Sequence, residues 1–254
     1  MSTSPTIQNG HASLTSESLI PLLQRYGMLP QLIREILIDR AIAPFSLSED
    51  ESLKAYEQFY QRYQLKSEDD LQNWLSRQGM HRDQLDHLMT RSLRLEKFKH
   101  QTWDHQVESY FLQRKAKLDR VIYSLIRTNS LELAQELYFR IQEGEQSFSE
   151  LARIHSQGPE AQTGGLIGPV ELSVPHPVLA NVLASSQPGQ ISPPTRLMEW
   201  IVLVRLEQFL PAQLDDTMRP RLLNELFDEW IQTQMETEGH QLTQQLLNAP
   251  SIPA

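Results

Sequence analysis

The 254-residue chain contains no cysteine, and this absence removes several kinds of chemistry at once. Without thiols there are no disulfides, iron–sulfur clusters, thiolate zinc sites or cysteine nucleophiles. The eight histidines offer no metal signature either, because no two of them have the i, i+4 spacing that places both on one helix face. We therefore expect neither a metal nor another cofactor.

The chain also lacks an excess of basic residues and any long apolar run. Its 23 basic and 32 acidic side chains give a net charge of −9, whereas phosphate binding needs a basic face, so nucleic acid is not the expected partner. No segment approaches the roughly 18 to 20 apolar residues of a membrane span. The polar stretch 1–18 has none of the basic residues of a secretory signal, which predicts a cytoplasmic location.

Helical periodicity dominates both ends of the sequence. Apolar residues recur at helical spacing from about residue 18 onward and again after Pro211. Ser48 with Glu51 has the capping-box spacing that predicts a helix start, and Ser67 with Asp70 repeats it. Between residues 82 and 117 there is neither glycine nor proline, which predicts one very long helix or two nearly continuous ones.

The character of the sequence changes after Leu118. The runs 121–126 and 200–206 are rich in β-branched and apolar residues, as strands are. Between them, Asn129 with Glu132 and Ser147 with Glu150 predict two capped helices. We therefore predict an α+β, mostly helical protein, in which a discontinuous helical bundle is interrupted by a small α+β domain. The predicted order is a disordered tail at 1–17, a helical domain at 18–118, the inserted domain at 119–208, a helix at 209–248 that completes the bundle, and a tail at 249–254.

A basic run and a pair of glycines each admit a functional interpretation and a purely structural one. A basic run at residues 91–100 is either a patch for an acidic partner or the solvated side of a helix, and the second is the commoner case. The Gly164-Gly165 pair followed by Gly168 lacks the Lys and Ser/Thr of a phosphate-binding loop, so phosphate binding is not expected.

The inserted domain carries the most specific motif. Over Arg120–Glu207 it resembles the parvulin family of peptidyl-prolyl cis/trans isomerases, whose pattern includes F-x-x-L-A-x-x-x-S, a G-G-x-L-G turn and p-G-x-x-S-x-P. The positions that match in order are Phe148, Leu151, Ala152, Ser156, Gly164, Gly165, Ile167, Gly168, Gly189, Ser192 and Pro193. The whole chain is similar to the helical chaperone–isomerases of the SurA and PrsA kind.

This resemblance implies a fold and a function. The fold is a four-stranded antiparallel sheet with helices around it, inserted into a helical chaperone domain. The function is assistance of folding, with proline-containing or unfolded polypeptides as clients and no cofactor. Rotation about an X-Pro bond crosses a barrier of roughly 18 to 20 kcal/mol and is slow enough to limit folding.

The resemblance also assigns site residues, and most of them depart from the family pattern. The two family histidines fall on Tyr123 and Trp200, and the family cysteine or aspartate falls on Gly158. Thr195 keeps the family's polar residue, and we expect a hydrogen bond between Tyr123 and Thr195. The expected substrate-binding residues are Val174, Pro175, Val178 and Leu183, where the family has a methionine, a glutamine and aromatic residues, together with Ile167 of the glycine turn.

Three functional hypotheses follow from these substitutions. The protein is an isomerase with an altered site, or a peptide-binding chaperone with little or no turnover. In the third hypothesis it is an adaptor, for example to a secretion apparatus. Because the apolar pocket is retained while the polar groups are replaced, we expect client binding with weak turnover.

Overall fold

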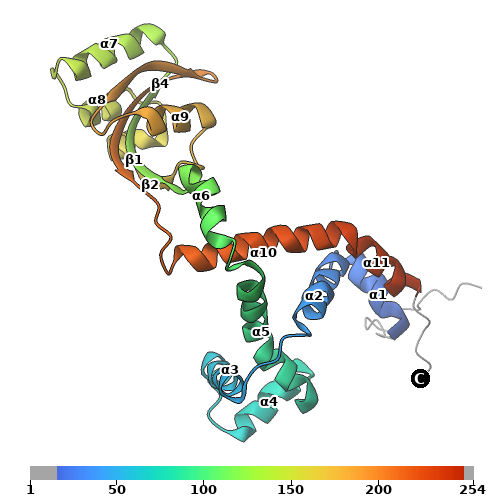
Figure 1. Cartoon of the computed structure of the whole chain (residues 1–254). Helices are drawn as coiled ribbons and strands as arrows, with labels where there is room; N and C mark the ends of the chain where they lie inside the picture. The colour runs from blue at the N-terminus through green and yellow to red at the C-terminus, as the bar shows by residue number, and fades with distance from the viewer. Residues whose placement is uncertain (1–15, 249–254) are drawn as a thin grey trace, which may run out of the picture. The chain divides into compact units, whose positions relative to one another are not determined.

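The computed structural model of the chain describes residues 16–248 and divides it into two compact units (Figure 1). One unit is Glu108–Arg219, and the other joins the residues up to Val107 with those from Pro220 onward. The helical unit is therefore formed by two segments that are separated in the sequence by the other unit. The two predicted tails fall mainly outside the described residues, although helix α1, Ser16–Arg25, begins within the first of them.

The helical unit contains two stretches of helix that are distant in the sequence. The run without glycine or proline forms two helices, α5 (Leu85–Trp103) in this unit and α6 (Val107–Leu118) at the start of the other unit, with residues 104–106 between them. Where one helix was predicted over 209–248, the structure has the end of a strand at Leu210, then helices α10 (Met218–Thr237) and α11 (Gly239–Asn248). The elements of this unit are α1, α2 (Leu29–Ile42), α3 (Glu49–Arg62), α4 (Glu68–Gln78), a 3-10 helix η1 (Arg82–Gln84), α5 (Leu85–Trp103), α10 (Met218–Thr237) and α11 (Gly239–Asn248).

Helix ends follow the capping signals closely. The Ser48–Glu51 capping box is present at the start of α3, and Ser67 caps α4 by accepting a hydrogen bond from the amide of Asp70. The prediction of Asn129 as a cap was wrong by one residue. Ser130 instead accepts a hydrogen bond from the amide of Leu133, and the helix begins at Leu131.

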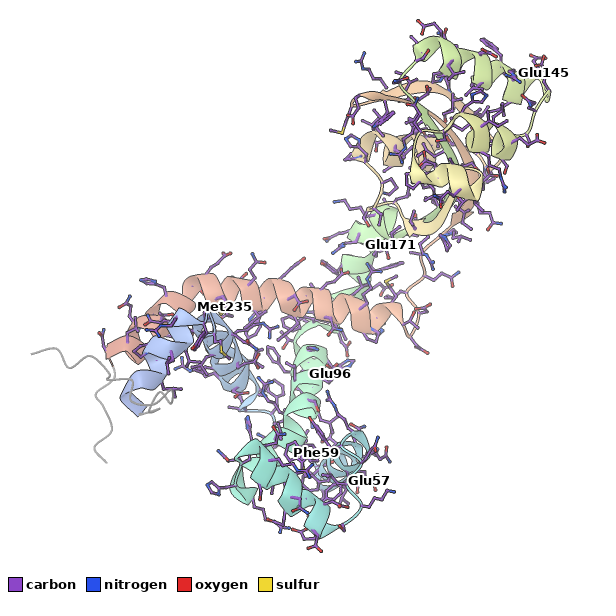
Figure 2. The ribbon with its side chains drawn as sticks, turned by 180° about the vertical axis from the view of Figure 1, so that it is seen from behind. Glu57, Phe59, Glu96, Glu145, Glu171 and Met235 are labelled. Atoms are coloured by element: carbon purple, nitrogen blue, oxygen red, sulfur yellow. The ribbon has the colours of Figure 1, made fainter. Side chains whose placement is uncertain are left out.

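Two aromatic groups hold the helical unit together. Phe59 lies where α3, α4 and α5 meet and packs edge-on against Trp74, with ring centroids 5.2 Å apart (Figure 2). Phe98 of α5 packs against Trp230 of α10, with centroids 5.1 Å apart. The segment after residue 220 therefore completes the core of the N-terminal helices.

The basic run on α5 is engaged within the helical unit. Arg91 bonds Asp39 and Glu35 of α2, and Lys97 bonds Glu51 of α3. These side chains link α5 to its neighbouring helices and Lys99 of the same run is buried, so the prediction of a solvated helix side is wrong for these residues.

The second unit is built on a four-stranded antiparallel sheet in the order β2-β1-β4-β3, which confirms the predicted fold class (Figure 1). Its strands are β1 (Arg120–Thr128), β2 (Leu166–Glu171), β3 (Ile191–Leu197) and β4 (Trp200–Leu210). Its helices, besides α6, are α7 (Leu131–Gln142), α8 (Phe148–His155), a 3-10 helix η2 (Pro159–Thr163) and α9 (Pro177–Ser185).

Helices cover both faces of this sheet because alternate strand residues point to opposite sides. On one face Ile126 and Leu203 pack with residues of α7 and α8 such as Leu137 and Leu151. On the other face the strands pack against α9, which contributes Leu179 and Leu183 to the core. Among residues 16–248, no helix is both long and apolar enough to cross a membrane.

Candidate functional site

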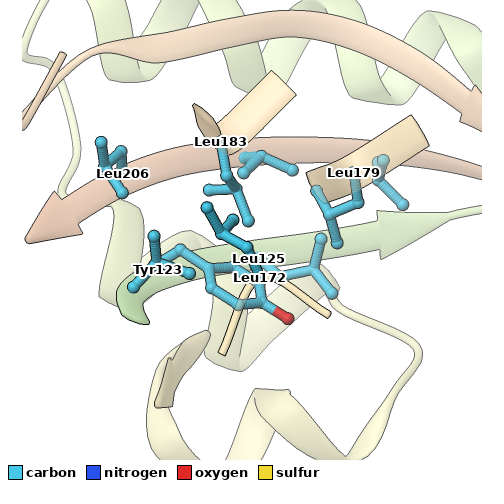
Figure 3. Close-up of a cluster of buried hydrophobic side chains, with 9 residues drawn as sticks. Tyr123, Leu125, Leu172, Leu179, Leu183 and Leu206 are labelled. Atoms are coloured by element: carbon cyan, nitrogen blue, oxygen red, sulfur yellow. The ribbon is translucent and has the colours of Figure 1, made fainter. Parts of the chain in front are cut away.

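The α9-facing side of the sheet contains the first residue of the predicted site. Val121, Tyr123 and Leu125 of β1 share this side with Leu206 of β4, and Leu183 of α9 packs over them (Figure 3). Most of this surface is apolar and buried. It forms a water-poor environment around the few polar groups that it contains.

Tyr123 is 6% exposed and lies between Ile167 of β2 and Leu206 of β4. Its hydroxyl points along the strand, away from Leu206 (Figure 3). Burial raises the pKa of Tyr123, with the Arg127 charge opposing this shift and the Glu160 charge adding to it. The side chain is therefore a neutral phenol at neutral pH, able to donate one hydrogen bond.

The structure does not bring Tyr123, Trp200 and Thr195 together as a hydrogen-bonded set. Trp200 lies six residues before Leu206, the β4 partner of Tyr123, which is about 20 Å along a strand. Thr195 pairs with Val202, and its hydroxyl donates to the carbonyl of Pro193 at 3.0 Å. The expected bond between Tyr123 and Thr195 is absent from the described part of the chain, since the strand register separates the two residues.

Gly158 lies beside a buried polar cluster that the sequence analysis missed. Arg127 donates from Nε and Nη2 to the two carboxylate oxygens of Glu160, each at 2.8 Å. The hydroxyl of Ser156 donates to the same carboxylate at 2.6 Å and accepts the amide of Arg127 at 3.1 Å. The motif serine thus ties helix α8 to β1 and to Glu160.

A sequence signal for this cluster exists, although it is weak. Arg127 is a charged residue that ends an otherwise apolar strand run, and Glu160 follows Gly158 by two positions. Nothing in the sequence joins the two, because 33 residues separate them. Only the fold identifies them as partners.

The expected substrate-binding residues are distributed over several environments. Leu183 is fully buried in the core and Ile167 packs against the same core. Val174, three residues before α9, is 70% exposed, and Val178 in the first turn of α9 is 42% exposed. Pro175 lines a separate hollow of about 480 Å³ together with Leu172, Ala180 and Lys117.

The glycine turn explains part of the motif on geometric grounds. Gly164 ends η2 with a φ of +65°, in the left-handed region that favours glycine. The carbonyl of Gly165 accepts the amide of Leu125 at 2.9 Å, and a Cβ on Gly165 would meet the Leu125 carbonyl oxygen at 2.8 Å. These glycines hold the turn against β1.

The residues of this candidate site are suited to excluding water and to hydrogen bonding. Among the described residues there is no group of three or more histidines and carboxylates that could hold a metal ion. The α9-facing side offers a neutral phenol, an internally paired arginine and an apolar floor. Such groups exclude water and can donate hydrogen bonds in an apolar environment.

Comparisons with known proteins agree with this geometry. Residues 125–208 match the family described as rotamase, the PPIC-type PPIase domain. No curated protein has a matching sequence.

Several solved structures are similar to the chain. The peptidylprolyl isomerase PrsA from Bacillus anthracis is 19% identical, with 82% of this chain and 97% of that chain covered and a TM-score of 0.46. A SurA-like chaperone from Campylobacter jejuni is 18% identical, with 99% and 100% covered and a TM-score of 0.38. Given the family match and the sheet described above, residues 125–208 form a domain of the PPIC-type peptidyl-prolyl isomerase family.

Proposed function

We propose that this protein is a parvulin-type folding factor that binds proline-containing polypeptides at its PPIC-type domain and isomerises them weakly. The observation that carries the proposal is the match of residues 125–208 to that family on a sheet of order β2-β1-β4-β3. The helical unit would then hold further segments of an unfolded client, as in the SurA and PrsA kind of protein.

An apolar surface on this domain is the main requirement for binding a polypeptide segment that contains proline. A prolyl bond rotates more easily when the twisted amide, which has lost its resonance, is stabilised more than either planar isomer. Such a site holds the proline ring among apolar groups and excludes water. The α9-facing side is apolar and offers the hydroxyl of Tyr123 as a neutral donor.

Weak turnover is proposed because of the polar groups that are replaced. Tyr123 and Trp200 stand where the resemblance places two histidines, and the register of β1 and β4 separates them by about six residues. A hydrogen-bonded pair like that of the family is therefore not available to assist rotation. A cytoplasmic location and an adaptor role for a secretion apparatus stay predictions, which cell fractionation and co-purification of partners would test.

A protease-free isomerisation assay on Xaa-Pro peptides tests this proposal, together with binding of the same peptides by calorimetry. We expect measurable binding and only a small rate increase over the uncatalysed reaction. Suppression of client aggregation in the same preparation would support the chaperone role. A large rate increase that Tyr123→Phe with Trp200→Ala abolishes would contradict weak turnover. Absence of both binding and isomerisation would overturn the function.

A further inference from the structure

The carboxylate of Glu160 is a deeply buried charged group of the PPIC-type domain. Its side chain is 2% exposed, whereas that of its partner Arg127 is 30% exposed. Two bonds from Arg127 and one from the Ser156 hydroxyl satisfy the carboxylate. A buried charge of this kind persists only when it is paired and hydrogen-bonded, so Arg127 and Glu160 form one structural unit.

This unit occupies the space beside Gly158 that a side chain would need. A Cβ added to Gly158 would collide with Nε of Arg127 and with both carboxylate oxygens of Glu160. The backbone of Gly158 is not in the left-handed region, since its φ is −113°. The ion pair, and not backbone strain, therefore fills the space that a side chain at position 158 would take.

Arg127 keeps one edge of its guanidinium available. Glu160 uses Nε and Nη2, and Nη1 has no hydrogen-bond partner among residues 16–248. Arg127 lies on the same side of β1 as Tyr123 and Leu125, because strand residues two positions apart share a face. The guanidinium is close enough to Tyr123 for its charge to act on the phenol. Arg127 therefore lies on the side of the sheet on which binding is proposed.

The charge of the unit indicates which ligand group it suits. Arg127 is already neutralised by Glu160, so an incoming anion would meet a pair without net charge and would lose its hydration. A neutral dipole such as a peptide carbonyl loses less and still accepts a charge-assisted hydrogen bond. The bidentate contact with Glu160 also fixes the direction of the free edge.

We propose that Arg127, held by Glu160 in the space beside Gly158, donates from Nη1 to a backbone carbonyl of the bound polypeptide. In this assignment Arg127 is a substrate-binding residue and Glu160 is its positioning residue. The inference rests on the proposed function, since it requires a polypeptide on this side of the sheet.

Peptide binding to the full-length protein tests the inference. Two otherwise identical Xaa-Pro peptides are used, one with alanine and one with glutamate before proline. We expect the wild type to bind the alanine peptide at least as well as the glutamate peptide. Arg127→Met should weaken binding of the alanine peptide about tenfold, the loss of one charge-assisted hydrogen bond.

Glu160→Gln tests for an effect on peptide preference that a purely structural role of Glu160 would not produce. It removes the negative charge while keeping the shape, so Arg127 gains attraction for anions. We expect preference to shift towards the glutamate peptide, with stronger salt dependence. Arg127→Lys, which keeps the charge without the planar fork, gives an intermediate loss and serves where Arg127→Met fails to fold. Arg140→Met and Glu136→Gln alter a similar pair on α7, across the sheet, and should change neither affinity.

The possible outcomes separate the inference from the function on which it rests. Equal binding by the wild type and Arg127→Met would overturn the inference and leave the proposed function standing. A wild-type preference for the glutamate peptide would also overturn it, in favour of anion recognition. If the wild type binds neither peptide, both the function and the inference fail.

Discussion

At the scale of single residues, the charged pair beside Gly158 distinguishes this domain from an ordinary apolar core. Glu160 is one of few buried polar residues in the described chain, and three hydrogen bonds compensate for its loss of hydration. Removing either partner leaves the other charge without compensation. The stability of the domain should therefore depend on both residues.

Glu160→Ala should lower the free energy of unfolding by about 3 kcal/mol, the lower end for a broken buried ion pair, because Arg127 is partly exposed and keeps some hydration. Urea unfolding measures the change. The matched control is Glu136→Ala, whose partner is Arg140 on the exposed side of α7; it should cost less than about 0.5 kcal/mol. Equal losses in the two variants would contradict the burial argument.

Tyr123 should make stability fall in alkaline solution. Burial raises its pKa in the folded protein above the ordinary value of 10.0. The unfolded chain then releases the proton first, so the contribution of Tyr123 is fully present below about pH 10 and is lost as pH rises through the folded pKa. The unfolding free energies of wild type and Tyr123→Phe, measured from pH 8 to 11, should differ by a constant amount until about pH 10, above which the wild type should lose stability relative to Tyr123→Phe. A constant difference throughout would disprove the assignment.

At the scale of secondary-structure elements, helix starts could be predicted from the sequence, whereas the edge strand β3 could not. Capping boxes at Ser48 and Ser147 are visible in the sequence and present in the structure, because they depend only on contacts three residues apart. Strand β3 contains Pro193 and Pro194, which are typical of turns, yet it forms an edge of the sheet. An edge strand tolerates prolines because part of its backbone needs no partner.

The cap of α8 offers a test at this scale. Ser147→Ala should lower the free energy of unfolding by about 1 kcal/mol, because the amide of Glu150 loses its acceptor. The hydroxyl and amide of Ser147 also hold the pKa of Glu150 below its usual value. The stabilisation that ionised Glu150 contributes to the folded protein is thus present above about pH 4.5, and it is lost as pH falls through the lower pKa of the folded state. Acid unfolding of Ser147→Ala should accordingly be less steep than that of the wild type, and an unchanged acid limb would argue against the cap.

At the scale of the whole molecule, one unit is formed by a single continuous segment and the other by two separate segments of the chain. The sheet-containing unit is continuous from Glu108 to Arg219 and contains both of its packed faces. The helical unit is discontinuous, and Phe98 of α5 needs Phe227 and Trp230 of α10 to complete its aromatic group. One unit should fold from a single segment and the other should not.

Isolated fragments test this difference. A fragment of residues 108–219 should fold cooperatively and show a spectrum with both strand and helix in circular dichroism. A fragment of residues 1–107 should lose much of its helicity, because it exposes the apolar side chains that α10 covers. Adding a peptide of residues 218–248 should restore helicity. Full helicity in fragment 1–107 alone would contradict the role of α10.

Local contacts explain why much of the architecture was accessible from the sequence alone. Apolar periodicity, serine caps and the spacing of motif glycines act over a few residues, and they predicted the helical ends, the strands at 121–126 and 200–206 and the inserted domain. The hydrogen bond of Arg127 to Glu160, the separation of Tyr123 from Trp200 and the burial of Leu183 depend on strand register and packing between distant segments. Such contacts are decided only when the chain folds, because nothing in the local sequence records which residue comes to lie across a strand or beneath a turn.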